Sequence, residues 1–143
     1  MNIKVYIDGS TMNGISRSGQ SGAGAVIKTC QGNVIAELRR YIGIRQPYEA
    51  EYMALIIALE YLTGLKDKFE NISFYADSDM VIDQITEKYP LKNPDLFGYY
   101  KESKRLLKKL KKYSNLTFSC IPSQDNKYAH RLAREAVGLC ELI

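Results

Sequence analysis

The stretch YEAEYMALIIALEYLTGL, residues 48–65, decides how the rest of the chain must be arranged. Its apolar residues recur at the three- and four-residue spacing that is typical of a helix. Pro47 suits the first turn of such a helix, because an N–H at that position has no partner within the helix in any case. Gly64 is a typical residue at a helix C-terminus. The stretch therefore predicts one long helix, and the elements on either side can be identified outward from it.

Before this helix the sequence predicts three strands. Ile3 to Asp8 alternate apolar and polar side chains, which is the pattern of a half-buried strand. Ala23 to Thr29 and Val34 to Tyr41 are strand-like as well, and Gln31 to Asn33 predict a tight turn between them. Gly9 to Gly24 are rich in glycine and serine and are expected to form a loop. The three strands are expected to form an antiparallel meander.

After the helix, strands and helices alternate. The predicted elements are a strand at Ile72 to Ala76, a helix at Ser78 to Lys88, a break at Pro90 to Pro94, a helix at Asp95 to Tyr113, a strand at Leu116 to Ile121, and a helix at Asn126 to Leu139. Helices that follow strands imply crossover connections and therefore some parallel strand pairing. We predict a single α/β domain, residues 1–143, with a mixed sheet covered by helices.

The composition is ordinary for a soluble globular domain. Apolar residues make up 45% and charged residues 25% of the 143 residues, and this length allows a sizeable core. No apolar run is long enough to span a membrane, and the sequence begins with a strand-like pattern, not a signal peptide, so the expected location is the cytoplasm. Cys30, Cys120 and Cys140 have no metal-binding or disulfide spacing, and we expect small buried thiols.

Positive charge is concentrated on the helix expected at residues 95–113. The net charge of the chain is +4. The basic residues of this segment are Lys101, Lys104, Arg105, Lys108, Lys109, Lys111 and Lys112. Such a run is usually a solvated helix face, and the alternative is a surface that binds the phosphates of a polyanion.

Three carboxylates stand where a ligand site could form. Asp8 and Asp77 follow the first and fourth predicted strands, and α/β sheets bind ligands at the carboxyl ends of their strands. Both also fit the alternative of a turn or a helix start, where aspartate is common. Glu51 shares a helix face with Leu55 and Leu62, where a charge is unfavourable unless it is paired or bound to a cation. The alternative for Glu51 is a first-turn acid favoured by the helix dipole.

His130 is the only histidine in the chain. It shares a predicted helix face with Ala133 and Val137, and a histidine on such a face is usually a packing residue. Its place in the first helical turn disfavours protonation, and neutral imidazole is the form that binds metal. His130 is therefore a candidate metal ligand, with core packing as the alternative.

These four residues could converge on one pocket. Carboxylates that lie close together repel one another, and divalent cations relieve that repulsion. Oxygen-rich sites suit Mg²⁺ or Mn²⁺, and two such ions can clamp the attacking and leaving oxygens of a phosphoryl transfer. The pattern indicates a metal-dependent site that acts on a polyanion.

Four stretches, in this order, resemble the ribonuclease H family. They are YIDGST at 6–11, AEYMALIIALEYL at 50–62, YADSDMVIDQI at 75–85 and NKYAHRLAREA at 126–136. The resemblance covers almost the whole chain and implies a ribonuclease H-like fold, with a five-stranded mixed sheet of order 3-2-1-4-5 and helices on both faces. It also implies endonucleolytic cleavage of the RNA strand of RNA–DNA hybrids with two Mg²⁺ or Mn²⁺ ions, leaving 5′-phosphate and 3′-hydroxyl ends.

The resemblance gives each candidate residue a role. Asp8 matches the aspartate that bridges the two metal ions. Glu51 and Asp77 match the carboxylates that complete the metal site next to the leaving oxygen. His130 matches the fourth catalytic position, usually an aspartate, which shares the other metal ion with Asp8. All four are candidate catalytic and metal-binding residues.

Two departures from the family pattern leave a second interpretation open. Histidine at position 130 removes one negative charge and favours Mn²⁺, because imidazole is the softer ligand. Argonaute-type nucleases, which are similar in fold, use an Asp-Glu-Asp-His set. Pro47 and Tyr48 stand where the family usually has asparagines that touch the minor groove of the hybrid. The alternative is a catalytically weak or inactive module that binds nucleic acid or a protein, and a further one is a nuclease with another substrate.

Contacts to nucleic acid are expected at two places. Small polar groups at Ser10, Thr11 and Ser78 are expected to touch 2′-hydroxyl groups. The basic helix is expected to hold phosphates through Lys101, Lys104, Lys108 and Lys111. The expected partner is an RNA–DNA hybrid, with double-stranded RNA as an alternative. The protein is expected to act as a monomer and without a membrane.

Overall fold

The computed structural model describes residues 1–12 and 18–138. These residues form a five-stranded mixed sheet of order β3-β2-β1-β4-β5, which confirms the predicted order. The elements are β1 (Asn2–Thr11), β2 (Gly19–Thr29), β3 (Val34–Arg45), α1 (Pro47–Gly64), β4 (Asn71–Ala76), α2 (Asp79–Ile85), η1 (Pro94–Leu96), α3 (Phe97–Lys111), β5 (Asn115–Cys120), η2 (Ser123–Asp125) and α4 (Lys127–Gly138). None of the helices in these residues has the length and apolar character that a membrane span requires.

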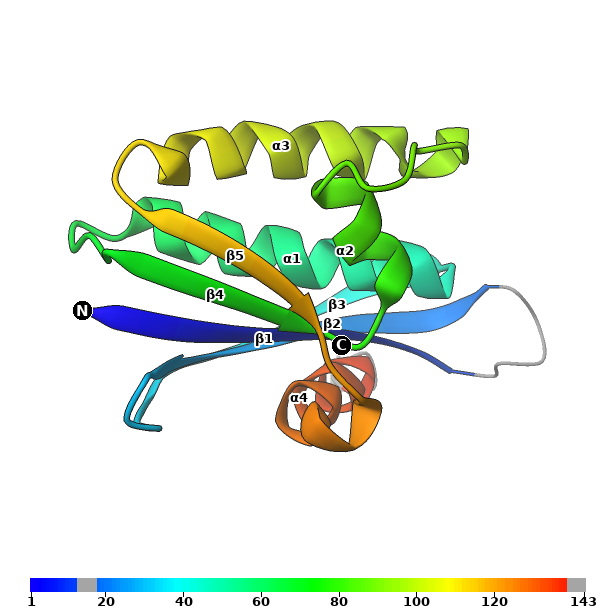
Figure 1. Ribbon diagram of the computed structural model, residues 1–143. Coiled ribbons are helices and arrows are strands. Elements are labelled where there is room, and N and C mark those ends of the chain that lie inside the picture. Colours follow the sequence, from blue (N-terminus) through cyan, green and yellow to red (C-terminus); the bar gives the residue numbers. More distant parts are fainter. Residues whose placement is uncertain (13–17, 139–143) are drawn as a thin grey trace.

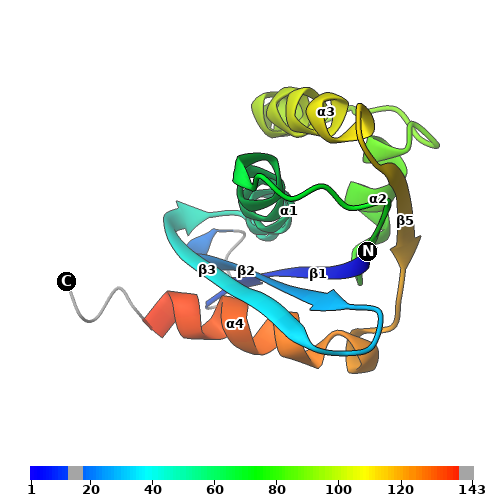
Figure 2. The same cartoon turned by 90° about the vertical axis from the view of Figure 1, so that its left-hand side faces the viewer.

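Helices cover both faces of the sheet, as predicted (Figures 1 and 2). On one face α1 packs against β1, β2 and β3, and α3 packs on α1. On the opposite face α4 packs against β1, β2 and β3. α1 therefore lies between the sheet and α3, which explains why its sequence is apolar on most sides. Its buried residues are Ala50, Tyr52, Ala54, Leu55, Ile56, Ile57, Ala58, Leu59 and Leu62.

The strand pairing combines an antiparallel and a parallel half. β1 pairs with β2, and β2 with β3, in the antiparallel meander that the sequence predicts. β4 pairs in parallel with both β1 and β5. The pairing of β1 with β4 ends at Ile7 opposite Ala76, although β1 itself continues to Thr11 beside β2. The sequence predicted that Asp8 ends its strand, but the strand continues beyond it. Asp8 is instead the first residue beyond the parallel ladder, and Asp77 is the first residue after β4.

The prediction of a loop over Gly9 to Gly24 was wrong at both ends. β1 extends to Thr11 and β2 begins at Gly19, whereas residues 13–17 lie outside the described part of the chain. The glycines of β2 serve close packing. A Cβ atom at Gly24 would lie 2.4 Å from the backbone nitrogen of Ala133 on α4. Glycine in a strand can mark such a close approach of another backbone, and here it does so within a regular ladder.

Several helix boundaries also differ from their predictions. α2 ends at Ile85, not at Lys88, and Glu87 has a positive φ of 62° that is incompatible with a continuing helix. The third predicted helix begins with a separate 3₁₀ turn, Pro94–Leu96, before α3. α4 is described to Gly138, and its predicted end at Leu139 lies outside the described residues.

The prediction of buried cysteines was wrong for two of the three. Cys30 and Cys120 are both exposed, free thiols. Cys30 lies in the turn that follows β2, and Cys120 is the last residue of β5, one of the two edge strands of the sheet. Cys140 lies outside the described residues.

We expect Gly24→Ala to destabilise the protein by about 1–3 kcal/mol, because the new methyl group forces α4 away from the sheet. Urea unfolding of the purified variant measures this change. Gly98→Ala is the matched control, because a Cβ atom at Gly98 on α3 would meet open space. The control is expected to be neutral or stabilising by up to about 1 kcal/mol. Equal stability of both variants and the wild type would contradict the close contact.

Candidate active site

Three carboxylates meet at the carboxyl ends of β1 and β4. Carboxylate oxygens of Asp8, Glu51 and Asp77 lie within 4.8 Å of one another. The two aspartates come from adjacent strands, one residue beyond the last pair of the parallel ladder. The structure therefore brings together the three acids that the sequence singled out.

Glu51 reaches the aspartates because the start of α1 crosses β1 at Gly9. A Cβ atom at Gly9 would lie 2.6 Å from the backbone nitrogen of Glu51, so any larger residue would separate helix and strand. A capping box fixes the start of α1, where the Gln46 N–H donates to the Glu49 carboxylate over 3.0 Å. Glu49 also accepts a hydrogen bond from the Tyr99 hydroxyl over 2.7 Å. It is engaged in holding the helix, which leaves Glu51 as the acid that faces the site.

Burial and mutual repulsion raise the pKa values of two of these acids. Burial, followed by the charge of Asp77, raises the pKa of Asp8 to about 6, against the opposing effect of His130. Burial, together with the charges of Asp8 and Asp77, raises the pKa of Glu51 to about 7, although a hydrogen bond with Ser78 opposes the shift. One carboxylate oxygen of Glu51, Oε2, is buried without a hydrogen-bond partner among the described residues. The cluster therefore has the properties of a cation site: excess negative charge and an oxygen without a partner.

His130 lies against Asp8. Its Nδ1 is 2.8 Å from the Asp8 carboxylate oxygen Oδ2, while the Asp8 side chain is 5% and the His130 side chain 51% exposed. The prediction that His130 belongs to the apolar stripe was wrong, although Ala133 and Val137 are buried as expected. His130 stands at the margin of the stripe, where one ring nitrogen reaches Asp8 and the ring remains accessible. It is not among the residues whose ligand atoms cluster with Glu51 and Asp77.

Asn126 holds α4 in the position that His130 requires, and the sequence reasoning missed it. The Asn126 side chain is 1% exposed and donates from Nδ2 to the Ile7 carbonyl over 2.8 Å. The His130 N–H in turn donates to the Asn126 carbonyl over 3.1 Å. An asparagine at the first position of a predicted helix is a signal for a local helix cap. The sequence did not indicate that this amide reaches the strand that carries Asp8.

A cleft of about 560 Å³ opens beside the aspartates and His130. Its other lining residues are Gly9, Ser123, Gln124 and Lys127. Lys127, the first residue of α4, is a second feature that the sequence reasoning missed. It places a positive charge at the edge of the acidic cluster, where an anionic group could approach.

The predicted nucleic-acid contacts lie at different distances from the site. Ser78 precedes α2 and touches Glu51, so it belongs to the site. Ser10 and Thr11 lie further along β1, where the Thr11 hydroxyl is 2.9 Å from that of Ser21. On α3 three of the four predicted lysines are exposed: Lys101, Lys108 and Lys111. Lys104 differs, because its ammonium group donates to the Ile85 carbonyl over 3.2 Å and pairs with Glu87.

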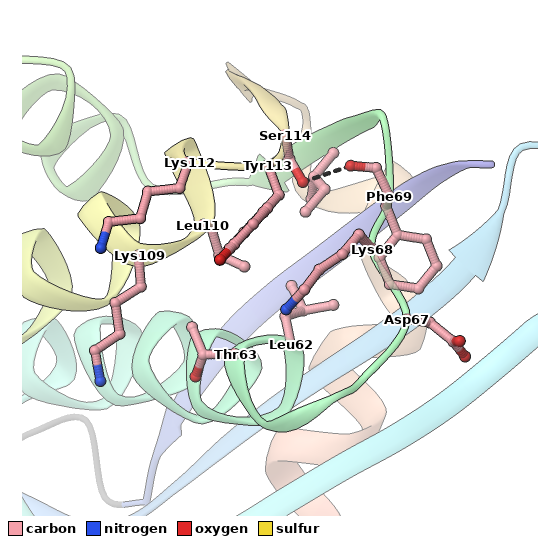
Figure 3. Close-up of a pocket in the computed structure, with 11 residues that line it drawn as sticks. Leu62, Thr63, Asp67, Lys68, Phe69, Lys109, Leu110, Lys112, Tyr113 and Ser114 are labelled. Carbon is pink, nitrogen blue, oxygen red and sulfur yellow. Dashed lines mark hydrogen bonds between the residues drawn. The ribbon is translucent and has the colours of Figure 1, made fainter.

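Another pocket, of about 260 Å³, lies at the opposite end of α1 (Figure 3). It is lined by apolar residues such as Leu62 and Leu110 and by three lysines, among them Lys68. The Lys68 ammonium group lies 4.6 Å from the centre of the Tyr113 ring. None of the clustered carboxylates lines this pocket, so it is separate from the candidate active site.

Comparisons with known proteins agree with the fold. A family model described as "Reverse transcriptase-like" matches residues 7–136. The putative hydrolase EbsB of Enterococcus faecalis is 30% identical over 94% of this chain and 93% of that protein. A bifunctional protein of Mycobacterium tuberculosis is 28% identical over 96% of this chain, which spans only 36% of that protein. The crystal structure of LC11-RNase H1 in complex with an RNA/DNA hybrid superposes with a TM-score of 0.87, at 30% identity over 96% of this chain and 98% of that one.

The raised pKa of Glu51 gives a testable dependence of stability on pH in metal-free protein. Between its ordinary value of 4.5 and about 7, the folded state holds a proton that the unfolded state releases. The free energy of unfolding therefore falls as the pH rises through this window. Glu51→Gln stays neutral, so we expect it to exceed the wild type by about 2 kcal/mol near pH 8 and to match it near pH 5.

Urea unfolding in EDTA at both pH values measures this difference. Glu70→Gln is the control, because Glu70 is exposed and outside the cluster, and it is expected to follow the wild type at both values. A Glu51→Gln effect of the same size at both pH values would contradict the link to ionisation.

Proposed function

This chain belongs to the ribonuclease H-like family, and from that membership we propose that it hydrolyses the RNA strand of RNA–DNA hybrids endonucleolytically. The observation that carries the proposal is the convergence of Asp8, Glu51 and Asp77 at one end of the sheet, with His130 against Asp8. The match to a ribonuclease H1 solved with an RNA/DNA hybrid supports the choice of substrate. The products would be a 5′-phosphate and a 3′-hydroxyl.

The acidic cluster suits two divalent cations, Mg²⁺ or Mn²⁺. The donors are hard carboxylate oxygens, and their mutual repulsion, together with the unpartnered Oε2 of Glu51, favours bound positive charge. Asp8 would be the ligand common to the ions, Glu51 and Asp77 would complete the site of one, and His130 would contribute to the site of the other. Ions held there would supply an activated water molecule and positive charge opposite the phosphodiester.

His130 can also handle a proton. While Asp8 is ionised, it accepts the hydrogen on Nδ1 of His130, and this contact fixes the tautomer in which Nε2 is the free acceptor. The ring is half-exposed beside the cleft, so Nε2 can accept a hydrogen bond from water, whereas an ion shared by His130 and Asp8 would take the place of the hydrogen on Nδ1. Asn126 acts on this residue indirectly, because it fixes the start of α4 against β1.

Lysines near the site could bind the phosphates of a polyanion. Lys127 lines the cleft, and the exposed lysines of α3 are assigned to DNA phosphates, with Lys104 joining them once it leaves Glu87. Contacts to 2′-hydroxyl groups are assigned to Ser10, Thr11 and Ser78. Double-stranded RNA would present the same groups and is the second substrate to compare. We propose that the protein acts as a monomer.

Cleavage of a labelled RNA–DNA hybrid in Mg²⁺ and in Mn²⁺ tests the proposed function. The wild type is expected to cut the RNA strand, and Asp8→Asn is expected to lower the rate at least about 100-fold, because the shared charge is lost. Asp67→Asn, which removes an exposed carboxylate outside the cluster, is expected to cut like the wild type. Binding of the hybrid without cleavage in either metal would instead identify an inactive nucleic-acid-binding module on this fold.

Metal preference tests the role of His130. His130→Asp is expected to raise the ratio of the cleavage rate in Mg²⁺ to that in Mn²⁺, because a hard carboxylate replaces a softer imidazole. His130→Asn, which has the size of aspartate without its charge, separates the loss of the ring from the gain of the carboxylate. A ratio that is unchanged in His130→Asp would argue against His130 as a ligand.

A further inference from the structure

One part of the sheet has no helix over it. α4 packs on β1, β2 and β3, and Figure 2 shows no described helix on the side of β5 that faces away from α2. The alternate residues of β1, β4 and β5 that point to this side form matched rows across the sheet. The rows are Asn2, Asn71 and Asn115; Lys4, Ser73 and Thr117; and Tyr6, Tyr75 and Ser119. No carboxylate lies in any of these rows.

Aromatic rings and cations form a continuous column toward this open face. The Tyr6 and Tyr75 rings are stacked, with centres 5.0 Å apart and planes at 21°. The Lys28 ammonium group lies 5.7 Å from the Tyr6 centre and 5.0 Å from the Tyr128 centre. The last member of the column is Arg131 on α4, with its guanidinium carbon 4.9 Å from the centre of the Tyr128 ring.

The column ends at Tyr75. The next residue in its row is Ser119, which is exposed and small. Because stacked rings on adjacent strands stand roughly upright on the sheet, the side of the Tyr75 ring away from Tyr6 faces the space above Ser119. That space is one strand spacing wide, about 4.8 Å, which is close to the separation of two stacked aromatic rings.

The charge around the open face favours an anion. Lys4 and Lys28 form no ion pair among the residues that the structure describes. Arg131 is partly neutralised, because it lies 3.6 Å from Glu37 and 3.4 Å from Glu135. The acids nearest to the tyrosines in sequence are those of the candidate active site.

The open face lies next to the candidate active site along β1 and β4. Tyr6 and Asp8 lie on the same side of β1, two residues apart, and Tyr75 and Asp77 follow the same pattern at the end of β4. Two residues of a strand span about 7 Å, which is roughly the spacing of successive nucleotides in an extended strand.

We propose that Tyr6, Tyr75 and the space above Ser119, flanked by Lys4 and Lys28, form a platform that binds single-stranded nucleic acid by stacking a base on Tyr75. Aromatic side chains on an open sheet stack unpaired bases, and neighbouring lysines hold the backbone phosphates. This tyrosine platform extends the substrate from the paired hybrid to an unpaired strand beside the site. The platform is proposed to bind a single strand and not to cleave it, so its binding can be tested separately from the proposed cleavage activity.

Fluorescence anisotropy in EDTA measures this binding, with a short labelled single-stranded RNA and a blunt RNA–DNA hybrid of the same sequence as probes. Tyr75→Leu removes the ring but keeps an apolar side chain, and it is expected to weaken single-strand binding about tenfold. Tyr75→Phe keeps the ring and is expected to restore the affinity. Tyr75 is half-buried, and Tyr113→Leu is the control, because Tyr113 is an exposed tyrosine beside a lysine, in the pocket of Figure 3 and away from the platform.

Variants at Ser119 test the same space without touching a tyrosine. Ser119→Ile covers the free side of the Tyr75 ring and is expected to weaken single-strand binding by about the same factor as Tyr75→Leu. Ser119→Ala keeps the position small and is expected to bind within about twofold of the wild type. Thermal unfolding checks that each variant is folded.

Two results would overturn the proposal. One is wild-type affinity for the single strand in both Tyr75→Leu and Ser119→Ile. The other is an equal loss for the single strand and the blunt hybrid, because the variants would then act on a surface common to both. A loss confined to the single strand supports the platform, whether or not the protein cleaves the hybrid in the metal assay.

Discussion

The parallel pairing of β1 with β4 is the constraint on which the rest of the structure depends. Parallel neighbours need a crossover between them, and α1 forms part of it. The same pairing brings the carboxyl ends of both strands to one edge, so that Asp8 and Asp77 become neighbours where the ladder ends at Ile7. The crossover then carries Glu51 past Gly9 to the same point. One backbone arrangement thus accounts for three acids from distant parts of the sequence.

The site is an unfavourable arrangement that the remaining structure maintains. Burial and neighbouring negative charge raise the pKa values of Asp8 and Glu51, and this cost of ionisation works against folding. A buried oxygen of Glu51 also has no partner in the described chain. The core of α1, its capping box and the glycine contacts with α4 supply the rigidity that holds these groups together. Strain of this kind concentrates at functional sites, because a preorganised set of ligands binds its target without further rearrangement.

Much of this arrangement could be predicted from the sequence, and the failures have physical reasons. Periodicity identified the strands and helices, and the acids at strand ends indicated a site, because both depend on local order. The extent of β2 was missed because Gly22 and Gly24 serve contacts with a helix more than a hundred residues away. The exposure of His130 was not predicted, since it depends on how far α4 overlaps the sheet at its start, where His130 stays accessible while Ala133 and Val137 are buried. Asn126 was missed because its partner, the Ile7 carbonyl, has no side-chain signature.

The docking of α4 has a consequence for the timing of synthesis. Asp8, Glu51 and Asp77 belong to elements that leave the ribosome early, whereas Asn126 and His130 arrive with the helix that is described last. A nascent chain therefore contains all three acids before the contact with His130 exists. If His130 is needed for cleavage, the growing polypeptide does not cleave RNA until α4 has packed against Gly22 and Gly24 of β2. Ribosomal RNA and the translated mRNA would then be protected during synthesis.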